Sequence, residues 1–82
     1  MKLYEFKAKA MAKLIVYQPK GKKEKEFVDS VIAKLHTLRA MNMPDLLLTL
    51  HFALNDVEIS SELKSIIKEI IKLAAEVVSA QD

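Results

Sequence analysis

The alternation of hydrophobic and polar residues is clearest in the last third of the chain. From Leu63 onward, apolar residues recur every three or four positions, with charged residues between them. This spacing places the apolar side chains on one face of an α-helix. Ser60 or Ser61 suits the N-cap, because a hydroxyl can accept a hydrogen bond from a free backbone N–H. The pattern predicts a helix over residues 60–80.

The middle of the chain predicts two further helices. Residues 23–41 carry apolar side chains at helical spacing, from Phe27 to Met41. Residues 44–55 begin with Pro44, which suits the first turn of a helix because its missing N–H costs no hydrogen bond there. This second helix is apolar on nearly every side. We expect a second chain to cover it, because a chain of 82 residues can hardly enclose a central helix alone.

The first part of the chain allows two interpretations. Residues 13–18 hold a β-branched and aromatic run, followed by the breakers Pro19 and Gly21, which predicts one short strand. A lone strand must find a pairing partner, and no second strand is evident downstream. In the alternative interpretation, an amphipathic helix begins near Lys2 and continues through Val16, which would make the protein a four-helix bundle.

Composition narrows the chemistry. The chain has one glycine, two prolines and no cysteine, which favours long helices over a turn-rich β fold and excludes disulfides and thiolate chemistry. We find no paired carboxylates, no nucleophile–base arrangement and no glycine-rich phosphate loop. His36 and His51 are 15 positions apart on different predicted helices. We therefore predict no enzyme, no metal site and no cofactor.

Charge is distributed unevenly along the chain. Residues 1–25 carry eight lysines against two acids, whereas residues 26–82 carry five basic residues against nine acids. A basic front indicates a polyanionic partner, and its alternative is a solvated lysine-rich surface of the kind found in proteins from hot environments. We find no secretory signal and no apolar run long enough to span a membrane. We therefore expect an intracellular, cytoplasmic protein.

The predicted order is one strand followed by two helices that a tight turn joins, with the second helix apolar on nearly every side. This order resembles that of the ribbon-helix-helix DNA-binding proteins of the MetJ/Arc type. The resemblance covers residues 13–56. It rests on the order of elements, on the strand–proline junction from Lys13 to Pro19, and on the turn Asn42-Met43-Pro44-Asp45. The added C-terminal helix is similar to that of elaborated members of the family from viruses of hyperthermophilic archaea.

The resemblance implies a mainly α fold with one short strand at about 13–18. Its three helices would lie at about 23–41, 44–55 and 60–80. Two chains would pair their strands and interlock their helices as an intertwined homodimer. The implied domain organisation is an N-terminal arm over 1–12, the ribbon-helix-helix unit over 13–56, and an additional helix over 57–82 packed on the same domain.

The function that the resemblance implies is sequence-specific recognition of double-stranded DNA by a transcriptional regulator. Strand alternation divides the ribbon into two faces. The face toward the bases would carry Lys13, Ile15 and Tyr17. A register shift of one residue would instead turn Leu14, Val16 and Gln18 outward.

Two further sets of residues follow from the same resemblance. The candidate phosphate contacts are Lys7, Lys9, Lys20, Lys22, Lys23, Lys25 and the main chain of Met43. The expected dimer core consists of Leu14, Val16, Leu47, Leu50, Phe52 and Leu54. No small-molecule substrate and no membrane partner is expected.

Two other functions compete with DNA binding. If residues 2–16 form a helix, the chain is an all-α module that binds a partner protein without DNA. If the basic segment Lys2–Lys25 lies on a lipid surface, the protein is a membrane-surface protein, although the apolar face of residues 3–11 is narrow for that. A continuous helix from 3 to 16 would favour the all-α module, and strand pairing at residues 13–18 would favour DNA binding.

Overall fold

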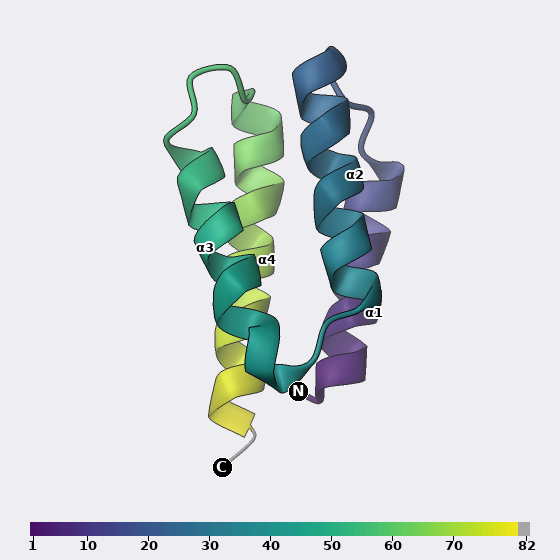
Figure 1. Ribbon diagram of the computed structural model, residues 1–82, viewed down its shortest axis with the longest axis vertical. Helices are drawn as coiled ribbons and strands as arrows, with labels where there is room; N and C mark the ends of the chain where they lie inside the picture. The colour runs from purple at the N-terminus through teal and green to yellow at the C-terminus, as the bar shows by residue number, and fades with distance from the viewer. Residues whose placement is uncertain (81–82) are drawn as a thin grey trace.

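The protein is a four-helix bundle (Figure 1). The computed structural model describes residues 1–80 and the side chains of residues 1–77. Its helices are α1 Leu3–Val16, α2 Lys22–His36, α3 Met43–Leu54 and α4 Ser61–Ala80, with a short 3₁₀ turn, η1 Ala40–Asn42, before α3. Residues 81–82 of the expected C-terminal segment lie outside the described residues.

The first helix corrects the predicted strand. Residues 13–16 complete α1, and no strand occurs anywhere in the described chain. The reason is a helical stripe that begins earlier: Phe6, Ala10 and Leu14 lie four positions apart and are all buried on one face. A ribbon formed by residues 13–18, and a dimer intertwined through that ribbon, are therefore wrong.

The sequence predicts a break at Pro19 and Gly21, and the structure has one there. It follows the end of a helix and not the end of a strand. Tyr17 is already extended, at φ −78° and ψ 136°. Gly21 then has a φ of +96°, a conformation that residues with a Cβ rarely adopt, and α2 starts directly after it. The segment 17–21 therefore reverses the chain so that α2 runs back along α1 (Figure 1).

The other three helices differ from the predictions mainly at their ends. α2 ends at His36 instead of residue 41, and the segment after it leads through the buried Leu38 into η1. Pro44 lies in the first turn of α3, as the sequence indicates. In α4, the Ser60 hydroxyl accepts the N–H of Leu63 at 3.3 Å, which caps the helix.

The core lies between the four helices. Its largest fully buried apolar side chains come from all of them: Phe6, Leu14, Leu35, Leu46, Leu50, Leu63, Ile67 and Ile70. α1 packs against both α2 and α4, and α3 packs against α4, whereas α2 and α3 make the sparsest contact of the neighbouring pairs. The bundle is therefore closed on three sides and loosely closed along the seam between α2 and α3.

Candidate interaction surface

A groove of about 470 Å³ runs along this loosely closed seam. Its apolar lining is provided by Phe27 of α2, by Phe52 and Ala53 of α3, and by Ile59 of the following loop. We call this feature the α2–α3 groove. It forms because the two helices that border it are joined by few direct contacts.

Large apolar side chains of α3 are exposed in the groove lining and one turn before it. Phe52 is 68% exposed, and Leu48, one helical turn before it, is 56% exposed. The opposite face of α3 buries Leu46 and Leu50 in the core. α3 is therefore apolar on a second face that the chain itself leaves in contact with water.

One end of the groove is acidic. The Lys23 ammonium lies 2.8 Å from the carboxylate of Asp56 and 3.0 Å from that of Glu58. These carboxylates raise the pKa of Lys23, and the Lys23 ammonium lowers the pKa of Asp56. Glu26 also lines the groove and is exposed, and no ion pair within residues 1–77 involves it. Of the three carboxylates there, Asp56 and Glu58 share the Lys23 ammonium, and Glu26 adds a negative charge without an ion-pair partner among the described side chains.

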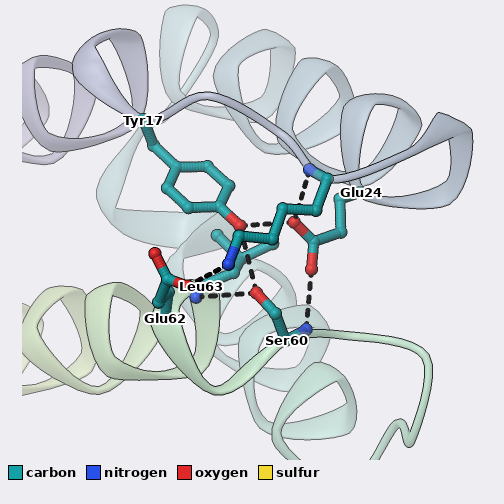
Figure 2. A network of polar contacts seen from close by, with 6 residues as sticks. Tyr17, Glu24, Ser60, Glu62 and Leu63 are labelled. Carbon is teal, nitrogen blue, oxygen red and sulfur yellow. Dashed lines mark hydrogen bonds and ion pairs between the residues drawn. The ribbon is translucent and has the colours of Figure 1, made fainter.

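A buried polar network fixes the same end of the bundle (Figure 2). Glu24 of α2 is 1% exposed. One of its carboxylate oxygens accepts the Tyr17 hydroxyl and, at 2.9 Å, the N–H of Lys20, and the other accepts the N–H of Ser60 at 2.6 Å. The Tyr17 and Ser60 hydroxyls are 3.1 Å apart. We call Tyr17, Glu24 and Ser60 the polar clasp.

The Glu24 carboxylate of the clasp is ionised, and the clasp has a structural role. Burial alone would raise the pKa of Glu24, but the hydrogen bonds from Tyr17, Lys20 and Ser60 hold that pKa at about 2. Burial is the main cause of the raised pKa of Tyr17, and the hydrogen bond to Glu24 raises it further. Both carboxylate oxygens already accept donors from the chain, so the clasp joins the 17–21 loop to the start of α4. It thereby also holds Ile59 at the end of the groove.

The residues expected to face DNA bases are not brought together on one face. The Lys13 ammonium pairs with Glu69 of α4 at 3.2 Å. Ile15 is 68% exposed, and Tyr17 points into the clasp. The alternation that placed the three on one side of a strand does not apply in a helix.

Most of the expected phosphate contacts have partners within the chain. Lys7 donates to the backbone carbonyls of His36 and Leu38, Lys20 pairs with Glu62, Lys23 with Asp56 and Glu58, and Lys25 with Asp29. Lys9 and Lys22 are exposed, and no ion pair of the described side chains involves them. Met43 is buried.

The residues expected in a dimer core divide into two groups. Leu14 and Leu50 are buried in the core of the single chain, and Leu47 and Leu54 are half-buried against it. Val16 and Phe52 are exposed, at 78% and 68%. The single chain thus buries two of the six, half-buries two and leaves two exposed, and the dimer core stays a prediction.

Sequence reasoning missed Glu24 and Phe27 as site residues. Glu24 is the lone acid in the lysine-rich run from Lys20 to Lys25, a pattern typical of a solvated linker. Its donors come from two loops, so no local spacing indicates them. Phe27 has helical spacing to Val31, and only the arrangement of α2 beside α3 shows that its ring reaches the groove.

Comparison with protein-family models, with curated proteins and with solved structures finds no match for this chain. Within residues 1–80, no helix combines the length and the apolar character needed to cross a membrane. The same residues contain no group of three or more histidine, aspartate or glutamate side chains placed to hold a metal ion.

Proposed function

We propose that this protein is a protein-interaction module whose α2–α3 groove binds an amphipathic helix of a partner protein. The observation that carries the proposal is the apolar groove with Phe52 exposed in its lining and Leu48 exposed one helical turn earlier on α3. Exposed apolar side chains gathered at a hollow are typical of interaction sites, whereas single exposed ones need no explanation. Helix binding in an apolar groove is a common mode of peptide recognition.

The size of the groove defines the ligand. α2 borders the groove from Lys23 to Ser30, and α3 borders it from Thr49 to Ala53. At a rise of about 1.5 Å per residue, the stretch of α2 corresponds to roughly 12 Å, or about two helical turns. The part of the ligand that fills the groove is therefore about two turns of helix. Its apolar side chains recur at i, i+3 or i+4, and i+7, so that they all point into the groove.

The charge at the groove sets the orientation of the ligand. Glu26, Asp56 and Glu58 lie at the end where α2 begins, with Lys23 between the last two. A partner helix with lysine or arginine at that end gains attraction and a faster encounter, and one with acids there is repelled. The proposed ligand is basic at the end that meets Glu26.

The structure removes two of the features on which the expectation of DNA binding rested. It lacks the ribbon through which the bases were expected to be read, and it pairs Lys13, Lys20 and Lys23 with carboxylates of the same chain. DNA binding as such stays a prediction. The helix that runs from Leu3 to Val16 is instead the feature that favours the all-α interaction module.

A display library tests the proposal. The library holds 14-residue helical peptides with a fixed apolar stripe and with lysine, glutamine or glutamate randomised at the flanking positions. We expect selection on the wild-type protein to enrich peptides with lysine near one end. Phe52→Gln should weaken their binding by on the order of tenfold, since one lost large apolar contact is worth about 1–2 kcal/mol.

The matched control is Val57→Gln. Val57 is 93% exposed but lies in the α3–α4 loop, and it does not line the groove. This variant should bind the selected peptides as the wild type does. Absence of enrichment, or selected peptides that bind Phe52→Gln as tightly as the wild type, would refute the proposal.

A further inference from the structure

A second exposed apolar surface lies on α1. Tyr4, Ala8, Met11 and Ile15 are spaced by four, three and four positions, so they form one stripe on the helix. Tyr4 is 69% exposed and Ile15 68%, Ala8 is exposed, and Met11 is half-buried. We call this stripe the α1 ridge. It faces away from Phe6 and Ala10, which α1 buries in the core.

The ridge is basic, in contrast to the groove. Lys22 and Lys25 line the hollow beside Ile15, together with the apolar Pro19 and Ile32. Lys25 is paired with Asp29 at 3.2 Å, whereas Lys22 has no carboxylate partner among the described side chains. The end of the ridge at Ile15 therefore presents a positive charge next to exposed apolar area.

We propose that the ligand of the α2–α3 groove is the α1 ridge of a second copy of this chain. This inference rests on the proposed function, because it names the partner of the same groove. The ridge has the chemistry that the groove selects: a helix of 14 residues, an outward apolar stripe, and lysines at one end. Lys22 of one copy would face Glu26 of the other.

Charge favours this pairing over the symmetric ones. With the helices running in the same direction, a ridge packed on a ridge would place the lysines beside Ile15 of the two copies close together. A groove packed on a groove would place two sets of carboxylates together. Like charges that face each other across an interface cost free energy, whereas ridge on groove places opposite charges together.

The contact is therefore heterologous, with a different surface used by each partner. A heterologous contact leaves one ridge and one groove free in every dimer. Further copies add to these free surfaces until a ring closes or a filament grows. The protein would thus assemble by itself into particles larger than a dimer, at concentrations that fill the groove.

A pair of complementary variants tests the inference by sedimentation velocity over a concentration series. Ile15→Gln removes the exposed apolar side chain at the lysine end of the ridge, and Phe52→Gln removes the exposed ring in the groove. Both residues are more than half exposed, so neither substitution opens the core. We expect the mass of the wild type to rise with concentration, and each variant alone to associate at least about tenfold more weakly.

The equimolar mixture of the two variants gives the decisive result. Phe52→Gln retains an intact ridge and Ile15→Gln an intact groove, so the mixture should form a one-to-one dimer and nothing larger. Val57→Gln is the control and should assemble as the wild type does. A mixture that stays monomeric, or a single variant that self-associates like the wild type, would overturn the inference.

The same samples separate this inference from the function on which it rests. A wild type that stays monomeric at every concentration, yet binds the selected peptides through Phe52, overturns self-assembly and leaves the interaction module standing. A wild type that neither self-associates nor binds selected peptides overturns both proposals. A monomeric wild type that binds phosphatidylserine vesicles, with the binding lost in Ile15→Gln, would assign the ridge to a lipid surface and also overturn self-assembly.

Discussion

The substitution Glu24→Gln tests the polar clasp most directly. The amide keeps the size of the carboxylate and one of its acceptor oxygens, which can still serve Tyr17 and the N–H of Lys20. Its NH₂ group then faces the N–H of Ser60, which loses its acceptor. A buried donor without a partner costs about 1–3 kcal/mol, and the lost charge weakens the remaining bonds.

We expect Glu24→Gln to lower the free energy of unfolding by about 2–3 kcal/mol at pH 7. For a domain of this size, this corresponds to a fall in Tm of roughly 10–20 °C. Urea unfolding followed by circular dichroism measures the first quantity, and a thermal scan measures the second. The matched control is Glu26→Gln, an exposed carboxylate on the same helix, which should change stability by less than about 0.5 kcal/mol.

The dependence on pH gives the prediction a second test. The pKa of Glu24 is lowered from 4.5 to about 2 in the folded protein. Stability from a lowered pKa is fully present above the unfolded value and is lost as the pH falls through the folded value. The difference between wild type and Glu24→Gln should therefore shrink between pH 4.5 and 2. A difference that is constant over that window, or equal to that of Glu26→Gln, would refute the reasoning.

Three further predictions concern the fold. Gly21→Ala should cost about 1–2 kcal/mol in urea unfolding because of the positive φ alone, since nothing lies within 4 Å of an added Cβ; unchanged stability would contradict this. Lys9→Pro should cost about 3 kcal/mol and Lys9→Ala almost nothing, because residue 9 lies inside α1; a free N-terminal arm would tolerate both. Ile67→Ala should cost about 2–5 kcal/mol, since Ile67 is fully buried, and a thermal scan that shows no loss would contradict the packing of α4.

The sequence predicts α4 well because nothing competes with its stripe. Residues 60–80 show one apolar face and one polar face, and the helix forms over Ser61–Ala80. The strand predicted at residues 13–18 was wrong because two signals conflict at residues 13–16. Ile15 and Val16 are β-branched, which favours a strand, but Leu14 continues the buried stripe of Phe6 and Ala10, and tertiary packing outweighs local propensity.

The candidate groove was predictable only in part. The sequence shows that residues 44–55 carry more apolar side chains than one buried face needs, and Phe52 and Leu48 are the exposed surplus. Which neighbour borders that surplus depends on how the hairpins dock, which no local pattern contains. Glu24 was unpredictable for the same reason, because the Ser60 N–H that it accepts is 36 positions away.

The clasp also bears on the order in which the bundle assembles. α1 with α2, and α3 with α4, are hairpins of consecutive helices, and contacts of short sequence separation form early. The hydrogen bond from Ser60 to Glu24 spans the two hairpins, so it can form only after they dock. An interaction made after the transition state leaves the folding rate unchanged and lowers the unfolding rate. We therefore expect the buried carboxylate to slow unfolding, which lengthens the lifetime of the folded bundle, without speeding folding.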